Sequence, residues 1–199
     1  MIYPKSLEET IEFLKRLPSV GEKSAERYAL SLTNFSEDDI NDFCKSLKKL
    51  KTKLKKCKIC GHITENEICD ICADETRNKK LICVLEDYKC VFAFEKVGNY
   101  RGQYHVLNGL ISPLDKIEPA NLNIESLVSR VSKEKDCEVI VALNSTIEGE
   151  MTTLYLKKIL EDKGVSISRL SYGISMGAEI DYLDPISLDK ALSDRKKIS

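Results

Sequence analysis

The sequence contains no stretch that would carry the protein into or across a membrane. No apolar run approaches the roughly 20 residues of a membrane-spanning helix, and the opening residues MIYPKSLEE are too polar for a secretory signal peptide. The phosphate-binding loop G-x-x-x-x-G-K-[ST] is also absent, which disfavours ATP hydrolysis. We therefore expect a cytoplasmic protein in which cysteine thiols stay reduced.

The composition is that of an ordinary folded protein, but the charge is unevenly distributed. Hydrophobic residues make up 42% and charged residues 32% of the 199 positions, so nothing indicates disorder, and the length suits one large or two small domains. Residues 1–56 are net basic and the remainder is net acidic, which indicates different partners for the two parts. Residues 45–56 carry seven lysines and no acid. A solvated helix face is the simpler explanation of that run, and a polyanion site is the alternative.

Four cysteines in the stretch CKICGHITENEICDIC form two C-x-x-C pairs separated by eight residues. In a reducing compartment such pairs are typical of a tetrahedral Zn²⁺ site, because the two-residue spacer turns both sulfurs of a pair to one side. We predict that four thiolates hold one structural zinc ion per chain and leave no open position for catalysis. These ligands are Cys57, Cys60, Cys69 and Cys72.

Other uses of these thiols fit the sequence less well. A redox C-x-x-C is normally single and lies at a helix start, and two disulfides are disfavoured in the cytosol. His62 could replace one thiol, but the fourth cysteine makes that unnecessary. The other cysteines lie among apolar residues and are most simply small buried hydrophobes: Cys44, Cys83, Cys90 and Cys137.

The residues before the cysteine pairs predict three helices. Ser6 and Glu9 have the spacing of a capping box at the start of the first helix, and Pro18 ends it. The second helix is expected from about residue 22 to 33. The third is expected to start at Ser36 and run into the cysteine pairs, because apolar residues recur at helical spacing.

The linker LPSVGEKSAER between the first two helices has the form of a phosphate-binding turn. Gly21 comes directly before a helix, whose N-terminal N–H groups attract anions. Lys23 and Arg27 lie four residues apart, so they project from one helix face beside the turn. This pattern favours a helix-hairpin-helix motif that grips the nucleic-acid backbone without reading sequence. An ordinary helical hairpin is the alternative.

The residues after the cysteine pairs predict strands that alternate with helices, and hence a parallel sheet. Glu86 ends the first of these strands, while Asn144, Glu148 and Glu150 follow a later one. Ligands of open α/β sheets bind at the carboxyl ends of the strands, so these acids could hold Mg²⁺. Solvated loop acids and a helix N-terminal charge preference are the alternatives. The expected strands are 81–86, 105–109, 138–143 and 165–170, and the expected helices lie around 91–94, 124–133 and 151–163.

Taken in order, these features resemble the RecR family of bacterial recombination mediators over essentially the whole chain. LPSVGEKSAERYALSL is similar to the family's helix-hairpin-helix, and CKIC…CDIC to its zinc finger. Three further segments are similar to parts of its Toprim domain: ICVLEDYKCVFAFEKVGNYRGQYHVLNGLISPLD, LNSTIEGEMTTLYL and YGISMGAEIDYLD. The acids of GAEIDYLDP are placed as in a Walker B strand.

The resemblance implies an α+β protein of several domains. In chain order, we expect a helical helix-hairpin-helix DNA-binding region at residues 1–56, a Cys₄ zinc finger at 57–72, an α/β Toprim domain with a mostly parallel sheet at 80–175, and a C-terminal Walker-B-like segment with a helix at 176–199.

The resemblance also implies a DNA-binding protein that is not an enzyme. Such a clamp acts with RecO-like and RecF-like proteins to help load RecA at single-stranded gaps in recombinational DNA repair. The family forms homodimers that assemble into a tetrameric ring around DNA, in the nucleoid-associated cytoplasm and away from membranes. Carried over by position, Lys23 and Arg27 contact DNA. Glu86, Glu148 and Glu150 fall in an acidic patch that binds Mg²⁺ or a partner protein.

The sequence departs from the family at two positions and from catalytic Toprim enzymes at one motif. Ser19 and Ser145 stand where the family usually has Gly and Pro. Catalytic Toprim enzymes carry Asp-x-Asp where this chain has Asn144-Ser145-Thr146, so two-metal phosphoryl transfer lacks its ligands. A Toprim-type metal-dependent nuclease or primase-like enzyme is therefore the second hypothesis, and a purely structural adaptor is the third.

Overall fold

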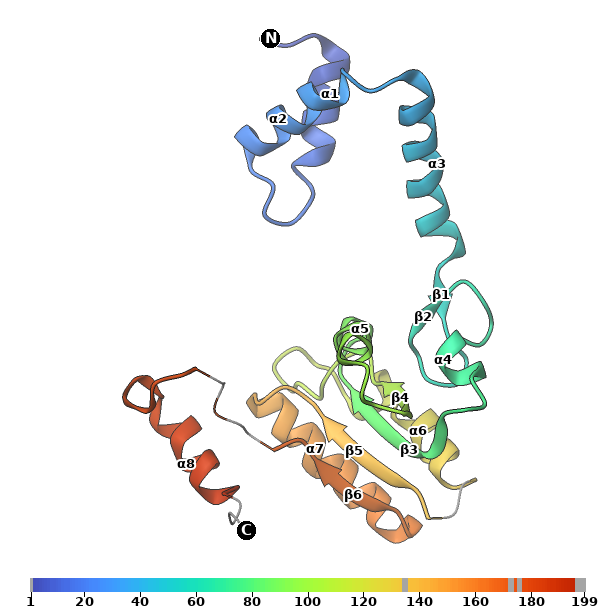
Figure 1. Cartoon of the computed structure of the whole chain (residues 1–199), viewed down its shortest axis with the longest axis vertical. Coiled ribbons are helices and arrows are strands. Elements are labelled where there is room, and N and C mark those ends of the chain that lie inside the picture. Colours follow the sequence, from blue (N-terminus) through green and yellow to red (C-terminus); the bar gives the residue numbers. More distant parts are fainter. Residues whose placement is uncertain (1, 134–135, 172–173, 175–176, 196–199) are drawn as a thin grey trace. The chain divides into compact units, whose positions relative to one another are not determined.

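The computed structural model describes residues 2–133, 136–171, 174 and 177–195. The chain divides into two compact units, Met1–Leu54 and Lys55–Ser199, whose elements are labelled in Figure 1. Among the described residues, every helix is too short or too polar to cross a bilayer.

The first unit consists of the three expected helices, α1 (Lys5–Leu14), α2 (Glu22–Leu32) and α3 (Glu37–Lys53). Helices α1 and α2 pack through the buried side chains of Ile11, Ala25 and Ala29. The two alanines let the helix backbones approach closely, because they fill little space between them.

The predicted capping box at the start of α1 is wrong, whereas Ser36 does begin α3. Pro4 is the N-cap of α1 and no side chain caps that helix. Proline fixes φ near the helical value, so the helix begins ahead of Ser6, and the Pro4 carbonyl accepts hydrogen bonds from the following turn. At α3, the Ser36 side chain accepts from the Asp39 N–H, and the Asp39 carboxylate accepts from the Ser36 N–H.

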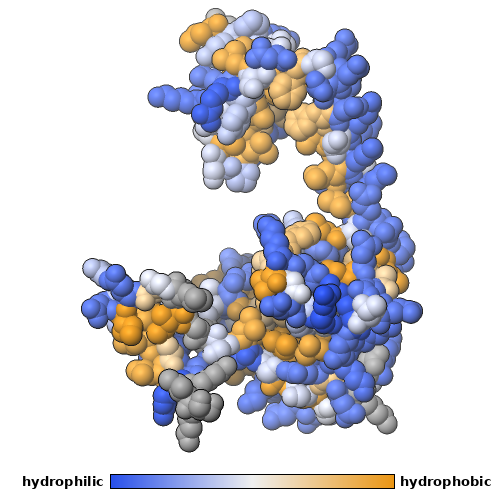
Figure 2. All heavy atoms as spheres, in the orientation of Figure 1, coloured by the Kyte–Doolittle hydropathy of each residue, from blue (hydrophilic) through white to orange (hydrophobic). Residues whose placement is uncertain are grey.

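Helix α3 has no buried residue. Its apolar side chains repeat at intervals of three and four, which places them on one side of the helix. In Figure 2, orange side chains follow one side of α3 and blue side chains the other. This exposed stripe comprises Phe43, Leu47, Leu50 and Leu54, which are 38–63% exposed.

The second unit opens with the cysteine pairs. The two-residue strands β1 (Lys55–Lys56) and β2 (Ile63–Thr64) form a small antiparallel ribbon, and helix α4 (Asp70–Ala73) follows. Together these elements hold the residues between the first and the last cysteine in a compact module.

The rest of the second unit is a four-stranded sheet whose neighbouring strands all run parallel, in the order β4-β3-β5-β6. This confirms the expected parallel sheet. The strands are β3 (Asn78–Leu85), β4 (Gly102–Val106), β5 (Glu138–Ala142) and β6 (Ser166–Arg169). The helices between them are α5 (Tyr88–Val97), η1 (Pro119–Asn121), α6 (Ile124–Val131), α7 (Ile147–Leu160) and η2 (Glu161–Lys163).

Strand β4 ends three residues earlier than expected. Asn108 adopts φ 63° and Gly109 adopts φ 145°, values that an extended strand does not use. The apolar run His105–Gly109 therefore contains the end of a strand and a turn, which periodicity alone could not separate.

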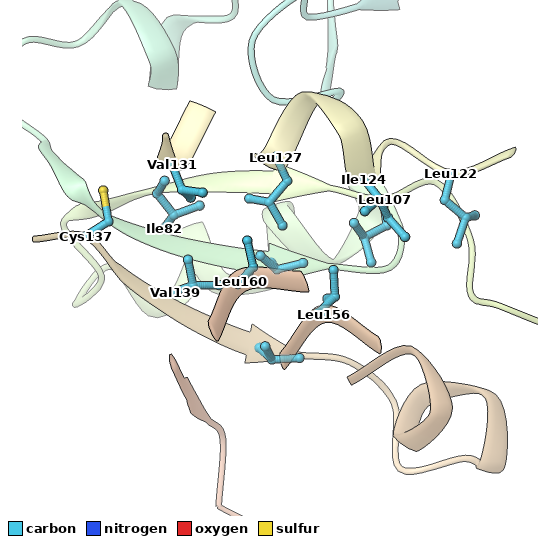
Figure 3. Close-up of a cluster of buried hydrophobic side chains, with 12 residues drawn as sticks. Ile82, Leu107, Leu122, Ile124, Leu127, Val131, Cys137, Val139, Leu156 and Leu160 are labelled. Atoms are coloured by element: carbon cyan, nitrogen blue, oxygen red, sulfur yellow. The ribbon is translucent and has the colours of Figure 1, made fainter. Parts of the chain in front are cut away.

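The sheet carries helices on both faces because successive residues of β3 point in opposite directions. Ile82 and Val84 belong to a cluster with residues of α6 and α7, whereas Cys83 and Leu85 pack with Val91 of α5. Figure 3 shows Leu127 and Val131 of α6, and Leu156 and Leu160 of α7, gathered around the first of these clusters.

The C-terminal segment follows with the 3-10 helix η3 (Ile180–Tyr182) and helix α8 (Pro185–Ser193). Within GAEIDYLDP, the segment whose acids are placed as in a Walker B strand, Ile180–Tyr182 form this short helical turn. Residues 172–173, 175–176 and 196–199, at the margins of this segment, lie outside the described residues.

Gly149, in the first turn of α7, provides a direct test of this packing. A Cβ at Gly149 would lie 1.9 Å from the carbonyl oxygen of Asn144, so we expect Gly149→Ala to lower the free energy of unfolding by about 3 kcal/mol or more, although alanine favours helices. Gly164→Ala is the control, because Gly164 has nothing within 4 Å and φ 67°, and should lose only about 1 kcal/mol. Urea denaturation measures both. Equal losses would contradict the close contact.

Candidate nucleic-acid interface and metal centre

The turn between α1 and α2 has the backbone of an anion-binding hairpin. The Val20 N–H bonds the Leu17 carbonyl, and Gly21 is the N-cap of α2 without a side-chain cap. The first-turn N–H groups of α2 are thus available to an anion. Ser19 adopts φ 63°, the left-handed region that costs a residue with a Cβ roughly 1–2 kcal/mol. The same hairpin therefore forms with serine in place of the family's glycine, at an energetic cost.

The predicted contact residues Lys23 and Arg27 flank this turn on exposed positions of α2. Neither forms an ion pair with any described carboxylate, and the guanidinium of Arg27 lies 5.3 Å from the ring centre of Tyr28. Lys15, by contrast, is neutralised by Glu12 at 2.8 Å and Glu22 at 2.6 Å. Lys23 and Arg27 therefore keep uncompensated positive charges next to the turn, as does Arg16, whose guanidinium lies 4.6 Å from the ring centre of Phe13.

The four cysteines form a site that fits a tetrahedral zinc ion. All four are buried, and their sulfur atoms lie within 4.8 Å of one another. The Cys60 and Cys69 sulfurs are 3.6 Å apart, close to the edge of about 3.8 Å that a tetrahedron with Zn–S bonds of about 2.3 Å requires. The Cys69 N–H also lies 3.3 Å from the Cys57 sulfur, a hydrogen bond that stabilises a thiolate. His62 is buried but lies outside this group of ligands.

The cysteine module is joined to the sheet at the end of β4. The Val106 N–H donates to the Cys60 carbonyl at 2.7 Å, and Asn123 donates from Nδ2 to the Val106 carbonyl at 3.0 Å. Gly61 adopts φ 75° at this junction, and a Cβ there would lie 2.7 Å from Asn123 Nδ2. Both the backbone conformation and the lack of space therefore favour glycine. The metal ligands and the edge of the sheet are therefore positioned by one set of contacts.

The acids at the strand ends do not gather around a common point. Glu86, directly after β3, accepts a hydrogen bond of 2.6 Å from Asn144 Nδ2. Burial raises the pKa of Glu86, and the charge of Asp87 adds to this, although the amide of Asn144 works in the opposite direction. Glu150 in α7 lies 3.5 Å from Arg169 and 3.7 Å from Lys190.

Among the described residues, the cysteine quartet is the one group of three or more His, Cys, Asp or Glu side chains close enough to hold a single ion. Glu86, Glu148 and Glu150 do not form a second group. The Asn144–Glu86 contact joins positions 58 residues apart. Their places after two strands of one parallel sheet indicated that they lie at the same edge, but not that they form a hydrogen bond. An amide here occupies the place where a catalytic Toprim enzyme would have a carboxylate.

Comparison with known proteins gives matches along the whole chain. Family models match at residues 7–51 (RecR, helix-hairpin-helix), 54–74 (RecR, Cys₄ zinc finger domain), 80–171 (Toprim domain) and 173–196 (RecR, C-terminal). The chain is 41% identical over 198 residues to proteins named Recombination protein RecR from Staphylococcus aureus strains JH9, Newman and COL, with 100% of each sequence covered. The chain belongs to the RecR family. Along this RecR-family chain, the zinc finger match precedes the Toprim match.

The metal assignment predicts a loss of zinc on substitution of one ligand. Cys57→Ser should lower the zinc content well below one ion per chain and lower the Tm by about 5–10 °C, since each kcal/mol is worth about 2–4 °C in a chain of this size. Cys44→Ser is the control, because Cys44 is an exposed cysteine on α3. Atomic absorption and thermal unfolding measure the two effects. A Cys57→Ser protein with full zinc and an unchanged Tm would refute the assignment.

Proposed function

We propose that this RecR-family chain is a sequence-independent DNA-binding clamp of recombinational repair, with no catalytic activity of its own. It acts with RecO-like and RecF-like proteins to help load RecA at single-stranded gaps, in the nucleoid-associated cytoplasm. The observation that carries the proposal is the α1–α2 hairpin, where two uncompensated cations flank an uncapped helix start. Its curated relatives are named recombination proteins.

The hairpin suits binding to the DNA backbone, and we propose no contact with base edges. Helix N-termini and lysine or arginine side chains contact phosphates, which carry no sequence information. Binding of this kind releases counterions, so affinity falls as salt rises. Lys23 and Arg27 are the proposed contact residues, and the near-neutral net charge of −1 suits a protein with a localised basic surface.

The exposed stripe of α3 supports the proposed homodimer, two of which would form the ring-like tetramer. Phe43, Leu47, Leu50 and Leu54 recur at intervals that alternate between three and four, the spacing of a helix–helix seam. A 17-residue helix with no buried residue in its own chain gains stability when a second copy covers this side.

The acidic patch of the Toprim domain is the proposed contact for a partner protein, with Mg²⁺ as the alternative ligand. The Asn144 amide already satisfies one carboxylate oxygen of Glu86, and Glu150 already lies beside two basic side chains. These contacts weigh against two-metal chemistry, which needs closely spaced free carboxylates.

The function is tested by titrating labelled gapped DNA at increasing salt with Mg²⁺ present. We expect Lys23→Ala/Arg27→Ala to bind more weakly and to reduce the slope of log affinity against log salt by about 1.4–1.8, since each phosphate contact contributes about 0.7–0.9. Lys23→Arg/Arg27→Lys, which keeps both charges, is the control and should keep the slope.

Two results would contradict the clamp. Unchanged binding by the double alanine variant would remove the hairpin from the interface. Cleavage or extension of the DNA that Glu86→Gln abolishes would instead support the nuclease or primase-like hypothesis. Electrophoresis of the recovered DNA distinguishes these outcomes.

Sedimentation velocity tests the proposed dimer contact through the exposed stripe of α3, by measuring the dimer dissociation constant. Leu47→Ser/Leu50→Ser should raise the dimer dissociation constant at least about tenfold, because two leucines that the partner would bury contribute about 1.5–3 kcal/mol each. Leu154→Ser, at a leucine on α7 with 64% exposure against 63% for Leu50, is the matched control. Equal assembly of all three proteins would exclude α3 as the seam.

A further inference from the structure

A cleft of about 700 Å³ lies between the cysteine module and helix α6, within the second unit. Lys58 and Cys72 of the cysteine module line one side, and the polar face of α6 lines the other. Lys79 of β3 and Gln103 of β4 also line it. Neither the family resemblance nor the hairpin assigns a role to this cleft, which is in the other unit of the chain.

The cleft is rich in cations that no carboxylate neutralises. Among the described residues, Lys79 and Lys133 form no ion pair. Arg130 donates to the Tyr104 carbonyl at 2.7 Å and to the Gln103 side-chain oxygen, so its donors are held by neutral acceptors and its charge remains uncompensated. Lys58 alone is paired, with Glu67.

The side chains of α6 alternate between core and cleft. Leu127 and Val131 are buried in the core, whereas Ser126, Ser129 and Arg130 line the cleft, followed by Lys133 directly after the helix. These four positions have helical spacing, so hydroxyl groups and positive charges follow one face. Among the described residues that line the cleft, Glu125 is the one acid. Hydroxyl, lysine and arginine groups in such a row are the donors that proteins present to phosphates.

The field of these cations also reaches into the sheet. His105 of β4 is buried and donates from Nε2 to the Asn123 carbonyl at 2.7 Å. Burial, and to a lesser degree the charge of Arg130, lower the pKa of His105 to about 4. The histidine is therefore neutral at physiological pH and adds no positive charge, so the cleft's binding should not depend on pH between about 6 and 8.

We propose that this cleft is a second nucleic-acid site, which takes the backbone of a single strand. A single strand is flexible enough to place successive phosphates in a concave space of this size, whereas a duplex presents a rigid convex surface. None of the described residues that line the cleft is aromatic, so these residues offer bases no stacking platform. Binding rests on charge and tolerates any sequence.

A competing explanation is that the cations balance the negative charge of a zinc–thiolate centre, because Cys72 also lines the cleft. Two exposed lysines, Lys79 and Lys133, can distinguish the two explanations, since neither side chain forms a hydrogen bond or ion pair with a described residue. Lys79→Gln/Lys133→Gln should leave the fold and the zinc content unchanged. Lys96→Gln/Lys158→Gln, at exposed lysines of α5 and α7 outside the cleft, is the matched control.

The experiment measures the binding of fluorescein-labelled oligo(dT) to the zinc-loaded full chain at several salt concentrations. Both lysine pairs are changed in the wild-type background and again in the Lys23→Ala/Arg27→Ala background. We expect Lys79→Gln/Lys133→Gln to reduce the salt slope by about 1.4 in either background, since each single-strand phosphate contact contributes about 0.7. The control pair should leave the slope unchanged.

Each other outcome has a definite meaning. An unchanged slope with Lys79→Gln/Lys133→Gln in both backgrounds overturns the second site and leaves the hairpin proposal intact. A slope that falls for the cleft variant but not for the hairpin variant supports the second site while contradicting the proposed hairpin contact. Weaker binding that accompanies zinc loss overturns the proposal in favour of charge balance. Equally tight, lysine-dependent binding of a polyglutamate peptide of matched charge also overturns it, in favour of an acidic protein partner.

Discussion

The hydrogen bond from the Val106 N–H to the Cys60 carbonyl is the contact on which the second unit depends. It joins the metal ligand Cys60 to Val106, the last residue of β4. The position of the zinc-binding turn is therefore fixed relative to the edge of the sheet. Gly61 is required at this point by its φ of 75° and by the nearness of Asn123. The five residues of β4 are all buried, although β4 is an edge strand, because the cysteine module packs against it.

At the acidic end of the sheet, too, polar groups bond to partners within the chain. The Asn144 amide occupies a carboxylate oxygen of Glu86, and Gly149 allows the start of α7 to approach the Asn144 carbonyl. A catalytic Toprim site would place like charges here and would need cations to hold them together. This chain instead places a neutral amide beside Glu86 and two basic side chains beside Glu150.

Motifs whose function resides in consecutive residues were predictable, and contacts between distant residues were not. The cysteine pairs indicated the zinc site because their spacing alone sets the sulfur geometry. The hairpin and the parallel sheet followed from turn residues and apolar periodicity. The capping box at Ser6 was wrong because Pro4 begins the helix earlier. The strand pattern placed Glu86 and Asn144 at the same edge of the sheet, but their hydrogen bond depends on how separate elements pack. The same holds for the basic cleft between the cysteine module and α6, which no local pattern encodes.

The topology of the sheet also orders the events of folding. Strand β3 pairs with β4, which follows it after one short helix, and with β5, which begins only at Glu138, long after β3 has ended at Leu85. Closing the longer loop costs more chain entropy, and synthesis from the N-terminus delivers β5 later. The cysteine module precedes both strands and docks on β4. The strands β3 and β4 and the zinc-binding module therefore leave the ribosome before Asn144, Glu148 and Glu150 do.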